Sequence, residues 1–152
     1  GVALLCTIGY EGFGQSTWMS TLLDHGVEAV VDVRDVPLSR KPGFSKSQLM
    51  RSLDAAGIEY VHVRALGNPR EYRDALRNGL NFGAFSGVFA SLLDQKDEVL
   101  QQVLDRAAYQ RVCLLCYEED PDRCHRSLVA ERLRDMRPDQ VQVIHLRNEH
   151  AA

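Results

Sequence analysis

Short runs of apolar residues alternate along this chain with longer segments in which apolar positions recur every three or four residues. The first pattern is typical of buried strands and the second of amphipathic helices. Strands are predicted at residues 3–8, 28–33, 58–63, 111–117 and 140–146. Helices are predicted at residues 16–25, 45–57, 72–77, 84–108 and 121–136, the fourth with a break near residues 95–97.

Polar residues mark the expected helix starts. Ser16 can cap the first helix, and Ser45 with Gln48 forms a capping-box pattern before the second. Asp120 followed by Pro121 predicts an N-cap and a first helical position for the last helix.

Alternation of strands and helices predicts an α/β fold. Because the strands are short apolar runs rather than strict alternations, both faces of the sheet should be covered. We therefore expect a three-layer αβα sandwich with a mostly parallel, about five-stranded, Rossmann-like sheet. Residues 1–152 suit a single domain of this kind, and the strand order is left open.

Composition is that of an ordinary globular protein. No apolar run approaches the roughly 20 residues of a membrane span, and no signal-peptide pattern is present. A cytoplasmic location is expected, and with it four reduced cysteines.

The net charge of −3 argues against bulk attraction to nucleic acid or anionic lipid. Basic residues nevertheless outnumber acidic ones between Arg34 and Arg73. That segment is either a solvated basic face or part of a pocket for an anionic group.

The largest group of potentially reactive side chains follows the fourth predicted strand, in Cys116-Tyr-Glu-Glu-Asp-Pro-Asp-Arg-Cys124-His125-Arg126. The cysteine spacing invites a metal site, but Cys113 and Cys116 should point to opposite faces of a strand, so none is predicted. A thiol near the helix start can have a lowered pKa. Because the surrounding carboxylates oppose a thiolate, a nucleophilic cysteine is an alternative rather than the favoured hypothesis.

His125 should point inward from the first helical turn toward the strand ends. Burial and the helix dipole favour its neutral form, which could accept a proton. Alternatively, its ring nitrogens could bond to carbonyl groups of the preceding loop. Glu118 is a second candidate for proton transfer.

Charged residues also follow the second predicted strand, in Asp32-Val-Arg34-Asp-Val-Pro-Leu-Ser39-Arg40. Asp32 could pair with Arg34 or Arg126, or it could act as an acid/base or hydroxyl-binding group. Arg34 and Arg40 suit bidentate binding of an anion, and Ser39 could donate a hydrogen bond.

Gly9 and Tyr10 lie where the first predicted strand ends. Gly9 would allow a ligand to approach the backbone closely, but the segment lacks the glycine pattern of dinucleotide-binding loops. The exits of parallel strands open on one edge of a sheet, so these residues should lie near His125.

Several motifs together resemble the domain-of-unknown-function 488 family. They are TIGYEG at residues 7–12, DVRDVPLSR at 32–40, PGFSK at 42–46, LGNP at 66–69 with Arg73, and CYEEDPDRCHR at 116–126. The resemblance implies a small single-domain α/β protein of prokaryotic type whose activity is not established. It draws attention to Asp32, Arg34, Ser39, Arg40, Cys116, Glu118, Cys124, His125 and Arg126.

The leading hypothesis is a small protein, enzymatic or not, that binds an anionic and nucleotide-like ligand. Arg34, Arg40 and Arg126 would hold the anion, while Asp32, Glu118 or His125 would handle protons. The alternatives are a nucleic-acid-associated or regulatory module, and thiol or metal chemistry through Cys116 and Cys124. No cofactor and no membrane partner are predicted, nucleic acid is less favoured than a small ligand, and the oligomeric state is left open.

Overall fold

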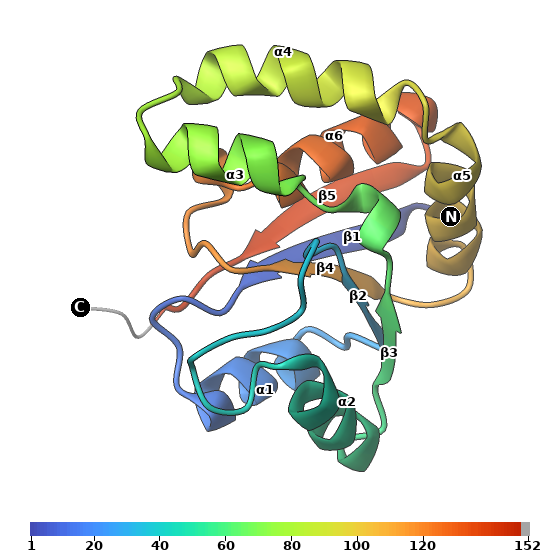
Figure 1. Cartoon of the computed structure of the whole chain (residues 1–152). Helices are drawn as coiled ribbons and strands as arrows, with labels where there is room; N and C mark the ends of the chain where they lie inside the picture. Colours follow the sequence, from blue (N-terminus) through green and yellow to red (C-terminus); the bar gives the residue numbers. More distant parts are fainter. Residues whose placement is uncertain (150–152) are drawn as a thin grey trace.

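Five parallel strands form one sheet between two layers of helices in the computed structural model, which describes residues 1–149 (Figure 1). The strands are β1 (Ala3–Gly9), β2 (Ala29–Asp32), β3 (Glu59–His62), β4 (Val112–Cys116) and β5 (Val141–Leu146). The helices are α1 (Gln15–Asp24), α2 (Lys46–Ala55), α3 (Arg70–Arg77), α4 (Phe82–Leu93), α5 (Asp97–Ala107) and α6 (His125–Met136), with short 3-10 turns η1 (Arg64–Leu66) and η2 (Pro121–Arg123). The predicted three-layer, parallel α/β architecture is confirmed.

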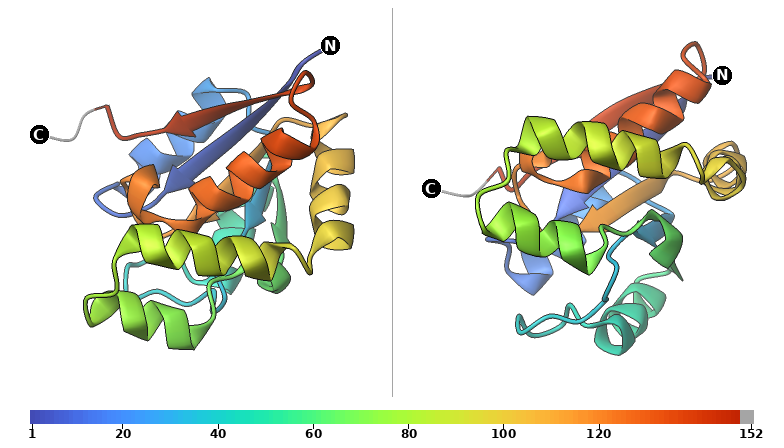
Figure 2. Two further views of the ribbon diagram at one scale, coloured as in Figure 1. Left: turned by 90° about the horizontal axis from the view of Figure 1, so that it is seen from above. Right: turned by 45° about the horizontal axis from the view of Figure 1, so that its top comes forward.

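Each face of the sheet has its own apolar core. On one side, α1 and α2 bury residues such as Trp18 and Leu53 against Ile8 and Val30. On the other, α4, α5 and α6 pack buried aromatic and aliphatic residues, among them Phe85, against alternate strand positions (Figure 2). Burial on both faces explains why the central strands β1, β2 and β4 are mostly apolar.

The strand order is β3-β2-β4-β1-β5. In the usual dinucleotide-binding order β1 lies beside β2, whereas here β4 separates them. Cys116 pairs with Gly9 of β1, and Leu115 pairs with Asp32 of β2. The carboxyl end of β4 therefore lies between the exits of the other two strands.

The starts of the first and last helices differ from the prediction. Ser16 is not a cap, since α1 begins at Gln15 after Gly14. Asp120 and Pro121 occupy the predicted cap and first positions, but of the short turn η2. The extended backbone of Cys124, with φ −127° and ψ 139°, interrupts the helix, so α6 begins only at His125.

The expected break in the long helical region is confirmed, since α4 ends before residues 95–97 and α5 begins there. Within residues 1–149, no helix combines the length and apolar character needed to cross a membrane.

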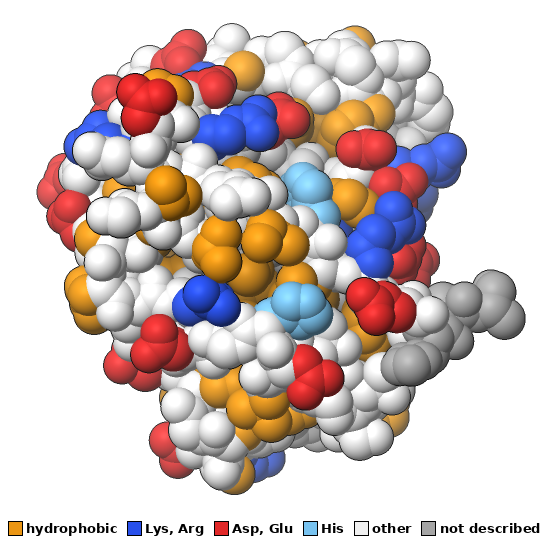
Figure 3. All heavy atoms as spheres, turned by 180° about the vertical axis from the view of Figure 1, so that it is seen from behind, with side chains coloured by type: hydrophobic (Ala, Val, Ile, Leu, Met, Phe, Trp, Pro, Cys, Tyr) orange, Lys and Arg blue, Asp and Glu red, His pale blue; other side chains and the backbone are white. Residues whose placement is uncertain are grey.

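The edge strand β5 is only partly covered. Val143, Ile144 and His145 are half-buried, and Figure 3, which views the molecule from the β5 side, shows hydrophobic side chains and histidines together near the middle of this face. Acidic and basic side chains lie around them.

Candidate functional site

A cavity of about 330 Å³ opens where the carboxyl ends of the parallel strands meet the loops that follow them. Tyr10 follows β1, Arg34 follows β2 and Cys116 ends β4, so three segments distant in sequence contribute to its wall. The other lining residues come from the loops after β2 and β4, the turn after η1, the helix α3 and the start of α6: Asp35, Val36, Leu38, Asn68, Arg73, Tyr117, Glu118 and His125.

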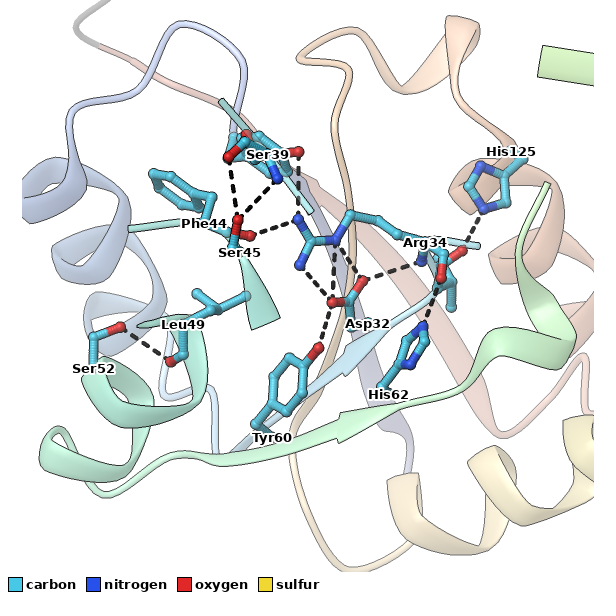
Figure 4. Close-up of polar contacts among 12 residues, drawn as sticks. Asp32, Arg34, Ser39, Phe44, Ser45, Leu49, Ser52, Tyr60, His62 and His125 are labelled. Carbon is cyan, nitrogen blue, oxygen red and sulfur yellow. Dashed lines mark hydrogen bonds and ion pairs between the residues drawn. The ribbon is translucent and has the colours of Figure 1, made fainter. Parts of the chain in front are cut away.

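Asp32 is completely buried and does not line the cavity. Its carboxylate accepts hydrogen bonds from Arg34 Nε at 2.9 Å, Arg34 Nη2 at 2.7 Å and the Tyr60 hydroxyl at 2.6 Å (Figure 4). The backbone N–H of Arg34 donates a further bond at 3.1 Å. Of the two ion pairs that the sequence left open for Asp32, the structure forms the one with Arg34, and the carboxylate anchors the exit of β2.

Arg34 connects this anchor to the cavity wall. Its Nη1 donates to the Phe44 carbonyl at 2.6 Å and to the Tyr10 hydroxyl at 3.4 Å. Burial lowers the pKa of Arg34, but the hydrogen bonds and charge of Asp32 outweigh burial and the net pKa is raised. All three guanidinium nitrogens already donate to protein acceptors, which leaves little capacity for an external anion.

Tyr60→Phe is expected to lower the free energy of unfolding by about 1.5–3 kcal/mol, because it removes a hydrogen bond to a buried charged group. Burial, followed by the bond to Asp32, raises the pKa of the Tyr60 hydroxyl, so this group stays a donor throughout the physiological range. Urea unfolding would measure the change. Tyr109→Phe is the control, because that side chain is 70% exposed and its loss should change stability very little.

Ser39 and Arg40 belong to the loop between β2 and α2 and do not line the cavity. The Ser39 hydroxyl accepts from the Lys41 N–H at 3.0 Å, and its backbone exchanges two hydrogen bonds with the Ser45 hydroxyl, at 3.0 and 3.1 Å (Figure 4). Ser45 therefore holds the loop and does not complete the predicted capping box. Arg40 is exposed.

Cys116, Cys124 and His125 form a buried cluster beside the cavity. The two sulfur atoms are joined in a disulfide, whereas the sequence predicted four reduced cysteines. The fold makes this possible by placing the start of α6 against the end of β4. Cys6 and Cys113 are buried free thiols.

The ring of His125 faces both sulfurs. Its Nδ1 lies 3.8 Å from Cys116 Sγ and 3.9 Å from Cys124 Sγ. Its Nε2 lies 2.7 Å from the Val33 carbonyl (Figure 4), which can only accept, so the proton is on Nε2 and the lone pair of Nδ1 faces the sulfurs. Burial lowers the pKa of His125 to about 4, so the ring is neutral. The two roles considered for this residue are thus compatible, because one nitrogen holds a carbonyl and the other is available.

Glu118 is half-buried on the cavity wall, with Oε2 3.0 Å from Cys116 Sγ. Burial raises the pKa of its carboxyl group, although Arg126 acts in the opposite direction. A carboxylate here can accept a proton from the Cys116 thiol once the disulfide is reduced.

Arg126 is completely buried and lies beneath the loop that follows β4. It donates to the Glu118 carbonyl, to the Glu119 carbonyl at 3.3 Å and to the Thr7 hydroxyl at 3.2 Å. Burial lowers the pKa of this guanidinium group. Arg126 was predicted to bind an anion, but the structure does not place it on the cavity wall; its contacts hold the loop that carries Glu118.

Gly9 also has different surroundings from those expected. A Cβ atom on Gly9 would overlap the Glu118 carbonyl, so protein backbone rather than a ligand occupies the space beside this glycine. Tyr10 does line the cavity. Its ring stacks on Phe44, with centroids 4.7 Å apart, and meets the edge of Tyr117 at 5.3 Å.

Asn68 and Arg73 were noted from the sequence only as parts of family motifs and were not predicted as site residues. Arg73 Nη1 donates to Asp35 Oδ2 at 2.7 Å and to the Asn68 carbonyl at 2.8 Å. Asn68 Oδ1 is buried without a hydrogen-bond partner among residues 1–149. The Leu-Gly-Asn-Pro turn was the available signal for these two residues, because it follows β3 at the sheet edge where the cavity opens.

Much of the basic segment between Arg34 and Arg73 is paired with carboxylates. The ion pairs are Arg34 with Asp32, Arg64 and Arg73 with Asp35, and Arg70 with Asp74. The local excess of positive charge is consequently smaller at the surface than the sequence count suggested.

Comparison with known proteins places the chain in a family. No curated protein and no solved structure matches it. The sequence model described as "Domain of unknown function DUF488" matches residues 16–133, which is most of the chain and includes the Asp32–Arg34 pair and the Cys116–Cys124–His125 cluster. The protein therefore belongs to the DUF488 family.

Proposed function

We propose that this protein carries out thiol–disulfide exchange through Cys116 and Cys124, with a small thiol or disulfide as its reaction partner. The observation that supports this most strongly is that a disulfide joins a residue on the cavity wall to the N-cap residue of a helix. The cavity volume of about 330 Å³ lies near the lower end of the range for small-molecule sites, about 300–1,000 Å³.

The two sulfurs have different surroundings, which suggests an order of reaction. Cys116 lines the cavity and Cys124 does not, so an incoming thiolate would attack Cys116 Sγ. Cys124 precedes the 12-residue helix α6, whose positive end stabilises a thiolate. Because a thiol of lower pKa is the better leaving group, Cys124 is suited to depart.

The reaction then proceeds in two exchanges. An external thiolate forms a bond to Cys116 Sγ while the Cys116–Cys124 bond breaks, leaving a thiolate on Cys124. A second external thiolate attacks the sulfur now attached to Cys116, an external disulfide is released, and Cys116 leaves as a thiolate. Two external thiols are oxidised and the protein disulfide is reduced, and the two protons of those thiols pass to the two cysteines. The Nδ1 of His125 and the carboxylate of Glu118 lie where they could relay them.

Binding of an anionic, nucleotide-like ligand at this edge is a weaker proposal. Both arginines on the wall, Arg34 and Arg73, are already bonded to carboxylates. A nucleic-acid-binding role would use the basic segment, where most arginines are likewise paired; steep weakening of binding by salt would distinguish it from a small-ligand site.

Equilibration with glutathione tests the proposed exchange. In anaerobic buffers of reduced and oxidised glutathione, we expect a single two-electron transition in which two of the four cysteines change state together. Acid quenching, alkylation and intact-mass measurement would give the reduced fraction. Cys124→Ser should trap glutathione as a mixed disulfide at Cys116, whereas Cys116→Ser should trap it far more slowly, because Cys124 does not line the cavity.

Cys113→Ala is the matched control, because Cys113 is a buried free thiol on the same strand and should not alter the transition. The proposal fails if the native protein resists reduction by glutathione, or if Cys116→Ser leaves the transition unchanged.

A further inference from the structure

Three potential metal-ligand atoms converge beside the cavity. Cys116 Sγ, Cys124 Sγ and a ring nitrogen of His125 all lie within 4.8 Å of one another, and all three side chains are buried. We infer that the reduced protein binds one thiophilic divalent cation of the Zn²⁺ class through these three atoms. The inference requires a reducible Cys116–Cys124 pair, and to that extent it rests on the proposed function.

The two distances from the histidine nitrogen to the sulfurs suit a tetrahedral site, and the sulfurs would separate when the disulfide is reduced. With Zn–S near 2.3 Å and Zn–N near 2.0–2.1 Å, the sulfur-to-nitrogen edge of a tetrahedron is about 3.6 Å. The two observed distances from His125 Nδ1 are 3.8 and 3.9 Å. The Cα atoms of Cys116 and Cys124 are 7.2 Å apart, somewhat beyond the roughly 4.4–6.8 Å that most disulfides span. Two thiolates on either side of a cation accommodate that separation.

The histidine is already oriented for a metal. Its Nε2–H donates to the Val33 carbonyl at 2.7 Å, which fixes the tautomer and directs the lone pair of Nδ1 toward both sulfurs. Metal-binding histidines almost always have such a bond on the nitrogen that does not bind the metal. Val33, which accepts this hydrogen bond, directly follows β2 and lies 92 residues before His125 in the sequence.

Glu118 lies outside this group of three atoms but contacts one of them, and its carboxylate is the candidate for the fourth position. Its Oε2 is 3.0 Å from Cys116 Sγ, and the side chain faces the cavity. Two thiolates, one carboxylate and a divalent cation carry a net charge of −1. The buried guanidinium of Arg126, bonded to the Glu118 carbonyl, has the opposite charge and brings the total to zero. Buried charges are tolerated when they are compensated in this way.

Oxidation and metal binding would exclude each other, because the same two sulfurs serve both. The disulfide leaves no thiolate for a cation, and a bound cation holds the two sulfurs apart. The metal site is thus a property of the reduced state alone, and it would protect the cysteines from oxidation.

Titration with Co²⁺ tests this inference. Protein reduced anaerobically and freed of metal with a chelator should bind one Co²⁺ per chain, with the visible bands of tetrahedral cobalt and a thiolate-to-metal charge-transfer band, and Zn²⁺ should abolish both. The same preparation with its disulfide intact should show neither. Cys116→Ser and Cys124→Ser should each weaken binding by at least about 100-fold, more than loss of an outer-shell partner does. Cys113→Ala should bind like the wild type. Glu118→Gln is expected to weaken binding while the thiolate-to-metal charge-transfer band is retained, and unchanged affinity would show that the carboxylate is not the fourth ligand.

Counting thiols in the same samples separates the two proposals. If both cysteines are reduced but no cobalt bands appear, the metal site is overturned and the exchange reaction stands. If the disulfide cannot be reduced in the native protein, both are overturned. Equal affinity in the Cys116→Ser protein would also overturn the metal site, and its circular dichroism would confirm that it is folded.

Discussion

Asp32→Asn is expected to lower the free energy of unfolding by about 3–5 kcal/mol, because it leaves the buried guanidinium of Arg34 without its counter-charge. Arg34 is 6% exposed and Asp32 is 0% exposed, so water cannot replace the carboxylate. The loss would be a large part of the roughly 5–15 kcal/mol that stabilises a typical domain. Urea unfolding followed by the fluorescence of Trp18, the single tryptophan and a buried one, would measure it.

Glu59→Gln is the matched control. Glu59 forms an ion pair with Arg106 at 2.7 Å, but its side chain is 59% exposed, so the change should cost less than about 1 kcal/mol. The wild type, Asp32→Asn and Glu59→Gln must be compared with the Cys116–Cys124 pair in the same oxidation state. Equal stabilities for Asp32→Asn and the wild type would show that the buried pair does not anchor the exit of β2.

Gly9→Ala is expected to displace the loop after β4 and to lower the free energy of unfolding by about 2–4 kcal/mol. The new Cβ would lie 2.5 Å from the Glu118 carbonyl carbon, and backbone atoms cannot move aside as a flexible side chain can. The Tyr117 carbonyl accepts hydrogen bonds from the N–H groups of Tyr10 and Glu11, at 3.1 and 2.9 Å, and displacement would weaken both. Because Glu118 moves with the loop, trapping of glutathione at Cys116 should change as well.

Gly87→Ala is the comparison for this variant. Gly87 lies in the middle of α4 with no other atom near the added Cβ, so alanine should stabilise the helix by about 0.5–1 kcal/mol. Urea unfolding of both variants is the measurement. If Gly9→Ala were as stable as the wild type, the close approach of β1 and the loop after β4 would not contribute to the free energy of unfolding.

Local hydrophobic patterns were sufficient to predict the strands and most helices, but they located the ends of these elements poorly. All five strands were predicted from apolar runs, and the break between α4 and α5 was also anticipated. The start of α6 was misplaced because Cys124 adopts an extended backbone after η2, and no local signal distinguishes that conformation from continued helix. The difference matters, since it makes Cys124 the N-cap residue and His125 the first helical residue.

The candidate site was partly predictable. The prediction that residues at the strand exits would gather rested on the parallel sheet, and Tyr10, Arg34, Cys116, Glu118 and His125 do line one cavity. The sequence suggested that Arg34, Arg40 and Arg126 were available to an anion. The structure instead engages Arg34 and Arg126 with protein acceptors, and it leaves Arg40 exposed and away from the cavity. A buried side chain bonds to whatever the fold places beside it, and that neighbour is not encoded locally.

For this protein, the sequence alone determined the class of fold and the edge of the sheet where the candidate site lies. Hydrophobic periodicity is a local property, and parallel strands bring their carboxyl ends together whatever their order. Only the tertiary structure decided the partners: Asp32 with Arg34 and Tyr60, Cys116 with Cys124, and His125 with the Val33 carbonyl. The physical reason is that hydrogen bonds and sulfur contacts act over a few ångströms, and the position of β4 between β1 and β2 sets those distances.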